Sequence, residues 1–275
     1  MGFKHYLKSL LFVRPVKRIF TRFIKWILMR KPYEFRSWSV FMVHNLDVGV
    51  ILVPVAGDYA YAWRYEEKPS SLFKCLLKVL GHGVFIDVGA YVGFYTVLAG
   101  KYGWRVVAFE PNPISLILLR YNIALHDVED RVVVVDKAAG DVHDYGRFSI
   151  ASYPSGSSFT KSLRSELRLL DIVVEITTID SALESLGVKD FDNLVVKVDV
   201  EGFGLRVLKG ARKTIERLRP FILFEVHRTF NEEDEIHALK MLRNLGYGFV
   251  VVEPRSRRNF IVYAYPREKG RLCYE

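Results

Sequence analysis

Residues 84–96 have the sequence VFIDVGAYVGFYT, and this stretch decides which fold the chain adopts. Residues 84–88 are apolar apart from Asp87, a pattern typical of a strand that is buried on both faces of a parallel sheet. Gly89 and Gly93 bracket the turn that follows. Because glycine has no Cβ atom, the backbone can turn sharply here and approach a ligand closely. The stretch therefore predicts a buried strand that leads into a ligand-binding turn.

The chain after this turn completes the outline of a nucleotide-binding βαβ unit. Residues 94–101 have helical character, and a second apolar run at 105–109 ends in Glu110, which lies 23 residues after Asp87. A carboxylate at this place can accept hydrogen bonds from both hydroxyls of a ribose. We therefore expect a nucleotide-type ligand, with glycines that only form a turn as the alternative.

The turn does not match the dinucleotide pattern G-x-G-x-x-G, because Tyr91 and Phe94 occupy its second and third glycine positions. A bulky side chain at the turn leaves little room for a pyrophosphate, but it does not exclude a ligand without phosphates. S-adenosylmethionine (SAM) is such a ligand. The pattern favours SAM over a nicotinamide dinucleotide, and a nicotinamide-dependent oxidoreductase is the less favoured alternative.

The third predicted strand, residues 131–136, ends in another acidic residue, Asp136. The loop after it would border the adenine, and Asp136 could accept a hydrogen bond from the adenine amino group. A solvated strand end is the alternative for Asp136. The complete set of expected cofactor contacts is Asp87, Gly89, Ala90, Tyr91, Gly93, Glu110, Pro111, Asn112, Asp136, Lys137 and Ala138.

Five blocks of sequence resemble the FkbM family of SAM-dependent methyltransferases. They are VFIDVGAYVGFYT, VVAFEPNP, VEITTIDSAL, VVKVDVEGFGLRVLKGA and FILFEVH, in family order across residues 84–227. The resemblance implies O-methylation of a hydroxyl on a saccharide, a lipid-linked glycan or a small metabolite. Two positions depart from the family pattern: Tyr91 stands where the family usually has Asn, and Gly204 stands where it usually has Glu.

The alternation of strands and helices predicts an α/β fold of the class I methyltransferase, Rossmann-like type. We expect a seven-stranded mixed sheet with one antiparallel strand and helices on both faces, closed by strands at 247–252 and 259–264. Residues 140–170 interrupt this rhythm and are expected to form a loop. The predicted organisation is a basic amphipathic helical segment at 1–37, a small β-meander and a helix at 38–80, and the methyltransferase domain at 81–275.

The net charge of +9 comes entirely from residues 1–33, which carry nine Lys or Arg and no acidic residue. The remaining 31 basic residues balance 31 acidic ones, so nucleic acid is not an expected partner. A helix at 1–33 could pack on the domain or lie on an anionic membrane surface. No apolar run is long enough to cross a bilayer, so we expect a cytoplasmic protein, with peripheral membrane contact as one option.

Cys75 and Cys273 are the only cysteines, and they are far apart in sequence. Without a short spacing motif we expect neither a disulfide nor a zinc site, and we expect a reducing compartment. The chain contains no glutamine, which hints at a thermophilic source. Nothing in the sequence indicates the oligomeric state.

Charged residues gather at the carboxyl ends of the last two buried strands, where α/β enzymes bind their ligands. We expect His227 to act as the general base, because its pKa lies nearest neutrality. Asp199 is the alternative base or orients the acceptor, and Lys197 is its ion partner. No metal is expected, although Asp199, Glu201, Glu225 and His227 together could instead bind a divalent cation.

Four further residues are expected near the acceptor. Ser157 and Ser158 belong to the loop at 140–170, and Glu201 and Glu225 follow the last two buried strands. Loops at strand ends commonly build substrate sites in α/β enzymes. A third hypothesis remains open, in which the protein keeps the fold without catalysis and acts through its basic N-terminal helix.

Overall fold

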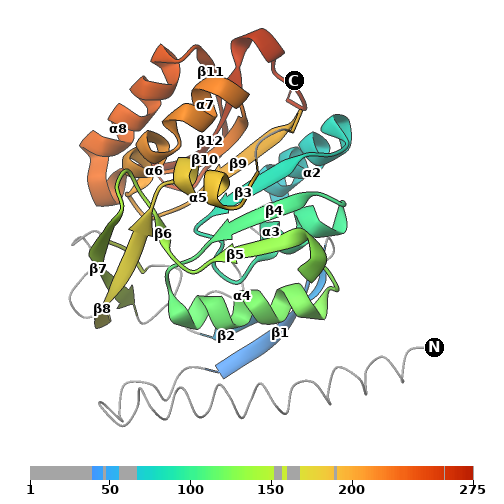
Figure 1. Ribbon diagram of the computed structural model, residues 1–275, viewed down its shortest axis with the longest axis vertical. Helices are drawn as coiled ribbons and strands as arrows, with labels where there is room; N and C mark the ends of the chain where they lie inside the picture. Colours follow the sequence, from blue (N-terminus) through green and yellow to red (C-terminus); the bar gives the residue numbers. More distant parts are fainter. Residues whose placement is uncertain are drawn as a thin grey trace. The chain divides into compact units, whose positions relative to one another are not determined.

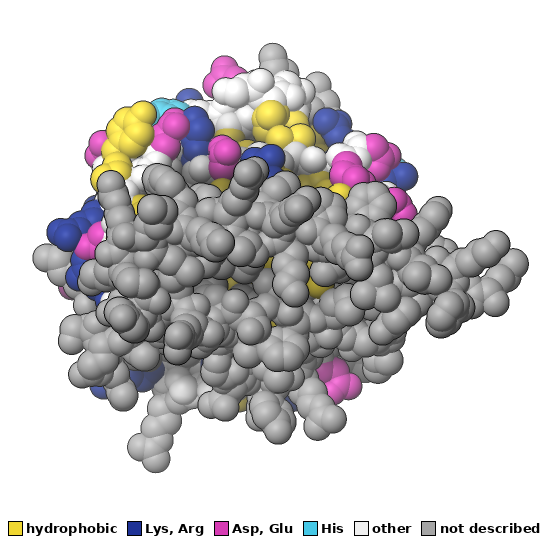
Figure 2. Space-filling model, turned by 90° about the horizontal axis from the view of Figure 1, so that it is seen from below, with side chains coloured by type: hydrophobic (Ala, Val, Ile, Leu, Met, Phe, Trp, Pro, Cys, Tyr) yellow, Lys and Arg dark blue, Asp and Glu magenta, His cyan; other side chains and the backbone are white. Residues whose placement is uncertain are grey.

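The computed structural model describes residues 39–45, 48–55, 67–151, 157–159, 168–188, 191–256 and 258–274. The predicted helix at 1–37 and its proposed membrane contact lie outside these residues. Within the described part of the chain, every helix is too short or too polar to cross a membrane. The face in Figure 2 shows acidic and basic side chains interspersed among its described residues, which agrees with the balanced charge of the chain after residue 33.

A seven-stranded sheet forms the centre of the fold, with the strand order β11-β12-β10-β9-β3-β4-β5 (Figure 1). β12 is antiparallel to both of its neighbours, and the other strand pairs are parallel. This confirms the predicted mixed sheet with one antiparallel strand. The strands are β3 (Val84–Val88), β4 (Arg105–Phe109), β5 (Val132–Val135), β9 (Leu194–Val198), β10 (Phe221–His227), β11 (Tyr247–Pro254) and β12 (Asn259–Pro266).

Helices cover both faces of this sheet, because successive side chains of a strand point to opposite faces. Phe85 and Val106 pack with one group of helices, whereas Ile86 and Val107 pack with the other. The first group is α2 (Glu67–Leu80), α3 (Phe94–Lys101) and α4 (Pro113–Leu125). The second group is α5 (Ile179–Ser185), α6 (Gly204–Gly210), α7 (Arg212–Leu218) and α8 (Arg228–Asn244).

Two helix boundaries differ from the sequence pattern. The sequence of residues 203–217, which Pro220 follows, predicts a single helix, whereas the structure has two helices, α6 and α7, which meet at Ala211. Asn231, which three acidic residues follow, predicts the start of another helix, whereas α8 begins at Arg228, directly after β10. Short 3-10 helices at Glu129–Arg131 and Arg267–Lys269 complete the helical elements of the described residues.

The predicted β-meander before the core contains a two-stranded sheet of β1 (Ser39–Asn45) and β2 (Gly49–Val55). β2 packs against α4, and Asn122 of α4 joins the two elements. Its side-chain amide accepts the N–H of Leu52 at 2.8 Å and donates to the carbonyl of Leu52 at 2.9 Å. β2 is therefore part of the hydrophobic core on the α2–α4 face.

The expectation of a loop at 140–170 is wrong for its first part. β6 (Ala138–Ala139), β7 (Asp144–Ala151) and β8 (Arg168–Thr177) form a second sheet in the order β6-β8-β7. Phe148 and Ile150 of β7 are buried, and the strand pairs antiparallel with β8. β7 contains Gly146 and several polar residues, so its strand state depends on a partner that follows much later in the chain.

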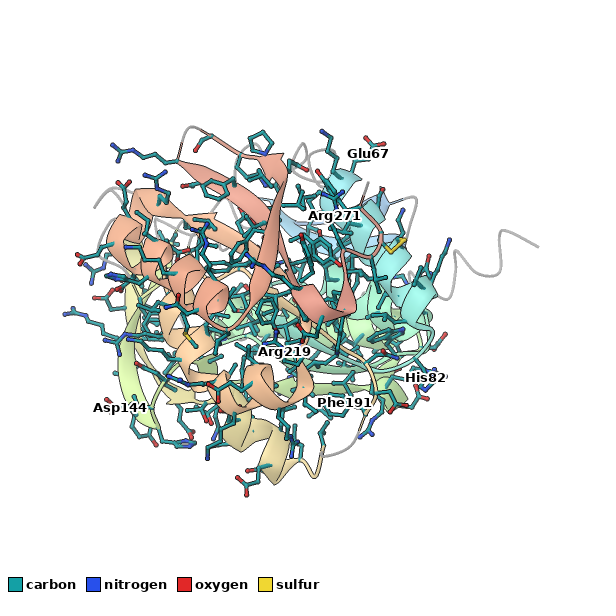
Figure 3. The ribbon with its side chains drawn as sticks, turned by 90° about the horizontal axis from the view of Figure 1, so that it is seen from above. Glu67, His82, Asp144, Phe191, Arg219 and Arg271 are labelled. Atoms are coloured by element: carbon teal, nitrogen blue, oxygen red, sulfur yellow. A yellow bond between two sulfur atoms is a disulfide. The ribbon has the colours of Figure 1, made fainter. Side chains whose placement is uncertain are left out.

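The expectation of two unlinked cysteines is also wrong. Cys75 and Cys273 form a disulfide with Cα atoms 5.8 Å apart, visible as a yellow bond beside α2 in Figure 3. The segment after β12 folds back against α2, which brings together residues separated by 198 positions. No local spacing motif in the sequence predicts such a contact. Because the two cysteines are linked, the expectation of a reducing compartment, which assumed unlinked cysteines, no longer has support.

Candidate active site

A pocket of about 650 Å³ lies at the carboxyl ends of β3, β4, β9 and β10. Ligands of open α/β sheets bind at this edge. Twelve of the residues expected at the site line the pocket: Asp87, Gly89, Ala90, Tyr91, Glu110, Pro111, Ala138, Ser157, Lys197, Asp199, Glu201 and Glu225. The fold thus brings the two predicted groups of polar residues, separated by about a hundred positions, into one cavity.

Gly89 is the point at which the two groups approach most closely. Its φ is 78°, and a Cβ atom added there would lie 1.9 Å from the carbonyl oxygen of Asp199. The N–H groups of Gly89 and Ala90 both donate to the carbonyl of Phe109, each at 3.0 Å. Only glycine satisfies both the left-handed backbone and the contact, so the turn is fixed against β4 and β9.

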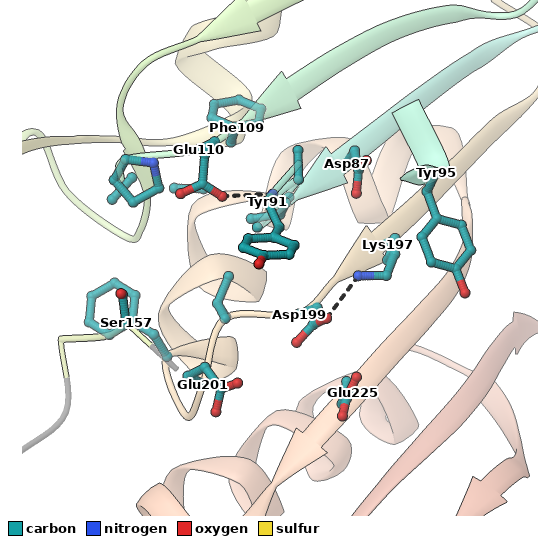
Figure 4. Close-up of a pocket in the computed structure, with 18 of the residues that line it drawn as sticks. Asp87, Tyr91, Tyr95, Phe109, Glu110, Ser157, Lys197, Asp199, Glu201 and Glu225 are labelled. Atoms are coloured by element: carbon teal, nitrogen blue, oxygen red, sulfur yellow. Dashed lines mark hydrogen bonds and ion pairs between the residues drawn. The ribbon is translucent and has the colours of Figure 1, made fainter. Parts of the chain in front are cut away.

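Glu110 is held by two backbone amides at the floor of the pocket (Figure 4). The N–H of Tyr91 donates to its Oε2 at 2.7 Å, and the N–H of Asn112 donates to its Oε1 at 2.8 Å. Burial raises the pKa of Glu110 to about 7, although the two amides act in the opposite direction. Each oxygen has further lone pairs, so the carboxylate can also accept the two hydroxyls of a ribose.

Asp87 is a second buried carboxylate in the same part of the pocket. Its Oδ2 accepts the hydroxyl of Thr96 at 2.7 Å, whereas its Oδ1 has no hydrogen-bond partner among the described residues. Burial raises the pKa of Asp87, and the ammonium of Lys197 opposes this shift. Sequence reasoning missed Thr96, whose only signal is a hydroxyl in an otherwise apolar helix turn.

The other part of the pocket is organised around Asp199. Its Oδ2 accepts from Nζ of Lys197 at 3.0 Å, and its Oδ1 lies 3.1 Å from Nε2 of His227. Burial favours the neutral carboxyl, but Lys197 and His227 outweigh that effect and hold the pKa of Asp199 below its usual range. The predicted Lys197–Asp199 pair is therefore formed in the structure.

His227 lies behind Asp199 and is almost completely buried. Its Nδ1 is 3.4 Å from Oε2 of Glu201, and its Nε2 is 3.8 Å from Oε1 of Glu225. Burial lowers the pKa of His227, but Glu201, Asp199 and Glu225 together raise it to about 10. An imidazole in this state already carries a proton at neutral pH, which argues against the predicted role of general base.

Glu201 reaches this cluster from an unusual backbone conformation, with a φ of 49°. Non-glycine residues in the left-handed region are uncommon, and such strain gathers at functional sites. Burial raises the pKa of Glu201 to about 7, against the effect of His227. The geometry directs one carboxylate each from Asp199 and Glu201 toward the same imidazole.

The family model of the methyltransferase FkbM domain matches residues 87–249 of this chain. The chain belongs to this family. It is also 29% identical over 224 residues to the hexuronic acid methyltransferase AglP of Haloferax volcanii, a match that covers 75% of this chain and 86% of that protein. Family membership makes the protein a methyltransferase.

Two solved structures are similar to this FkbM-family chain. The methyltransferase FkbM from Methylobacillus flagellatus KT is 21% identical with a TM-score of 0.46, and the match covers 67% of this chain but only 44% of that one. The O-methyltransferase from Bacillus cereus, in complex with SAH, is 11% identical with a TM-score of 0.46, and the match covers 72% and 81% of the two chains.

The structure shows the surroundings of the two departures from the FkbM pattern. Tyr91 has a φ of 54°, a left-handed conformation that Asn tolerates better than Tyr. At Gly204, an added Cβ atom would lie 2.4 Å from the ring of Phe224 and 3.1 Å from Oε1 of Glu235. A carboxylate from α8 therefore lies beside the position at which the family usually supplies one.

Six expected residues do not line the pocket. Gly93 precedes α3, Asn112 caps α4 through the N–H of Ile114, Ser158 forms a buried bridge with Ser149, and His227 lies behind Asp199. Asp136 is exposed beside Arg120, and Lys137 pairs with Glu175. These last two make no contact that supports the expected role at the adenine.

Sequence reasoning missed an aromatic wall on the other side of the pocket. Phe159 stacks on Phe203 with ring centroids 4.6 Å apart, and Phe148 meets Phe159 edge-on at 5.2 Å. All three side chains line the cavity, together with Arg255 from the chain after β11. The rings come from three separate segments, so no pattern in the sequence places them together.

Proposed function

We propose that the protein transfers a methyl group from SAM to a hydroxyl group of a sugar. The observation that carries this proposal is the division of one pocket into two halves. The β3 and β4 ends offer Asp87 and Glu110 beside a glycine turn, and the β9 and β10 ends offer a charged cluster around Asp199. An enzyme that joins two substrates needs two such adjoining sites.

The first half fits SAM. Glu110 suits the ribose hydroxyls, and the buried Oδ1 of Asp87 lacks the N–H donor that the amino group of SAM would provide. Gly89 lets the turn of this half lie directly against the backbone carbonyl of Asp199, where any other residue would clash. When bound, SAM would supply a methyl group on a sulfonium, which is a good leaving group.

The second half suits an acceptor that carries hydroxyl groups. Carboxylates accept hydrogen bonds from hydroxyls, and Asp199, Glu201 and Glu225 line this half. A hydroxyl that is methylated must lose its proton, and a carboxylate of this edge is better able to take it than the protonated His227. The acceptor class is supported by the likeness to AglP, whose name states action on hexuronic acid.

Calorimetric titration of SAM into the full-length protein tests the cofactor, with NAD as the competing ligand. We expect SAM to bind, NAD to give no heat, and Glu110→Ala to weaken SAM at least tenfold. Glu268→Ala is the matched control, because Glu268 pairs with Arg219 away from the pocket. No SAM binding by the folded protein, or NAD binding in its place, would overturn the proposal.

Transfer of tritium from methyl-labelled SAM then tests the acceptor. Neutral hexosides and hexuronides are offered in parallel, and the products are hydrolysed in mild base. An O-methyl ether survives this treatment, whereas a methyl ester does not. We expect base-stable label on a sugar; label that is entirely base-labile would mean that a carboxylate is the acceptor.

A further inference from the structure

Three carboxylates line the acceptor half of the pocket, and their surroundings suit them to different tasks: Asp199, Glu201 and Glu225. Asp199 lies between two cations, with its Oδ2 3.0 Å from Nζ of Lys197 and its Oδ1 3.1 Å from Nε2 of His227. Although burial favours the neutral carboxyl, these cations hold the pKa of Asp199 below its usual range. Asp199 can therefore orient an acceptor hydroxyl through a hydrogen bond, but it is a weak acceptor of a proton.

Glu225 also faces positive charge. Its Oε1 lies 3.7 Å from Nε of Arg255 and 3.8 Å from Nε2 of His227. A nearby cation favours the ionised form of a carboxyl group, and two cations face this oxygen. Glu225 resembles Asp199 in this respect, so its charge is better suited to holding an acceptor than to removing a proton.

Glu201 has the surroundings of a proton acceptor. Burial raises the pKa of Glu201 to about 7, and the positive charge of His227 opposes this shift. The negative charges of Asp199 beside β9 and Glu235 on α8 act in the same direction as burial, whereas the charge of Lys197 opposes them. A general base works best when its pKa lies near the pH at which the enzyme operates. Among the three carboxylates, Glu201 therefore fits this task.

The backbone places the Glu201 carboxylate where an acceptor can reach it. The residue lies in the turn that follows β9, with a φ of 49°, and its side chain lines the pocket and is 19% exposed. In Figure 4, Glu201 and Asp199 lie in the same part of the pocket. One oxygen of each lies within 4.8 Å of the other. A single hydroxyl can therefore lie within hydrogen-bond distance of both carboxylates.

His227 holds the Glu201 carboxylate from behind. Its Nδ1 lies 3.4 Å from Oε2 of Glu201, and its side chain is only 5% exposed. The imidazole is carried by the last residue of β10, whose backbone N–H donates to Oε2 of Glu235 at 3.4 Å. Because His227 does not line the pocket, it acts on an acceptor only through the carboxylates that it contacts.

We propose that Glu201 is the general base of methyl transfer and that His227 is a positioning residue, which holds the Glu201 carboxylate through Nδ1. This assignment rests on the proposed function. The hydroxyl oxygen forms a bond to the methyl carbon while the bond from that carbon to sulfur breaks and leaves its electron pair on the sulfur. The hydroxyl proton passes to the carboxylate of Glu201, which releases it to water after the product has left.

The first test is the pH dependence of kcat for the full-length protein at saturating SAM, so that titration of Glu110 in the empty cofactor half does not contribute. A base works only when it is ionised, so kcat should rise with pH through about 7. Glu201→Gln should lower kcat by about 10²–10⁴-fold and abolish this rise. Glu225→Gln should lower kcat but keep the rise, and Glu268→Gln, outside the pocket, should change neither. A rise that persists in Glu201→Gln would overturn the proposal.

His227→Gln separates positioning from a merely structural role. The substitution removes a positive charge that lowers the pKa of Glu201, so the rise of kcat should move to higher pH. A loss of packing alone would lower kcat at every pH and leave the rise in place, and this result would overturn the role of His227. Circular dichroism checks that the variant is folded.

Nuclear magnetic resonance tests the same two groups without an acceptor, and on the wild type if His227→Gln does not fold. With ¹³C-labelled glutamate carboxyls, the signal that is missing from Glu201→Gln should titrate near pH 7, and a midpoint near 4.5 would overturn the proposal. With ¹⁵N-labelled histidine, both ring nitrogens of His227 should be protonated at pH 7.5, and a neutral ring would overturn its role. Since neither measurement needs methyl transfer, failure of this assignment and failure of the proposed function are distinguishable.

Discussion

The two halves of the pocket hold their carboxylates in different ways. In the cofactor half, Glu110 accepts backbone amides at Tyr91 and Asn112, and Asp87 accepts the hydroxyl of Thr96. In the acceptor half, Asp199 and Glu201 face His227 from another strand. The first arrangement is made mainly by backbone and by residues near in sequence, and the second by charged side chains from distant segments.

Because of this difference, the two halves should respond differently to the substitution of single side chains. Backbone amides persist when a neighbouring side chain is changed, so the cofactor half should tolerate substitutions elsewhere in the pocket. A buried ion pair leaves an uncompensated charge when one partner is removed. Methyl transfer should therefore be lost when a single charged residue of the acceptor half is replaced, while the cofactor half still binds SAM.

The largest expected effect on stability tests whether the cofactor half is independent of the rest of the fold. Replacing Cys75 by Ser opens a disulfide that closes a loop of 198 residues. Loop-closure entropy predicts a loss of about 5 kcal/mol in the free energy of unfolding. Urea denaturation measures this loss, and calorimetry should show unchanged SAM affinity while the protein is folded. A loss of SAM affinity without denaturant would contradict the independence of the cofactor half.

Gly89→Ala changes the residue at which the two halves of the pocket are in contact. Left-handed alanine costs about 1–2 kcal/mol, and the contact with the carbonyl of Asp199 forces the turn and β9 apart, so we expect a total of at least about 3 kcal/mol. SAM binding should be lost as well. Gly187→Ala is the matched control, since Gly187 has a φ of 65° but no atom within 4 Å of its added Cβ. Similar losses in both variants would mean that strain, not the contact, explains the result.

Asp199→Asn tests whether the two halves of the pocket act independently. The substitution leaves Lys197 and His227 without their anion, and we expect methyl transfer to fall by about 10²–10⁴-fold. SAM affinity should change by less than about twofold, since no backbone amide of the cofactor half is touched. Radiolabel transfer and calorimetry give the two numbers. If SAM affinity falls as steeply as the rate, the halves are not separate.

Glu110→Gln gives the smallest expected change, which is a change in how the free energy of unfolding depends on pH. The pKa of Glu110 is raised from 4.5 to about 7 in the folded protein, so the folded state holds a proton that the unfolded state releases between these values. This group therefore lowers stability as pH rises from about 5 to 7, by up to about 3 kcal/mol. Denaturation at pH 5 and pH 7.5 should show a smaller difference for the variant than for the wild type. An equal difference in both proteins would assign the pH dependence to another group.

Much of the fold follows from short segments of sequence. The boundaries predicted for β3 and β4 agree with the structure at both ends, and the helix predicted at residues 94–101 is α3. These elements are predictable because an apolar run or a glycine turn acts on its immediate neighbours. β7 was not predicted, because its pairing with β8 outweighs the turn-forming character of its own residues.

The candidate site was predictable only in part, for the same reason. The sequence placed polar residues and turns at strand ends, which sufficed to collect twelve of the expected site residues, six of them charged, in one pocket. It could not show that His227 lies between carboxylates that raise its pKa, because that depends on distances between side chains at the ends of β9 and β10. Glu235 was missed altogether, since a helix that begins with several acidic residues normally exposes them.

The sequence by itself determined the βαβ unit, the order of the strands of the central sheet, and the edge of that sheet at which charged residues gather. These features depend on the periodicity of apolar residues and on the backbone freedom of glycine, which are properties of neighbouring residues. Only the tertiary structure decided the Cys75–Cys273 disulfide, the aromatic wall and the raised pKa of His227. Each of these depends on the distance between atoms that the chain brings together from remote positions, and on the exclusion of water around them.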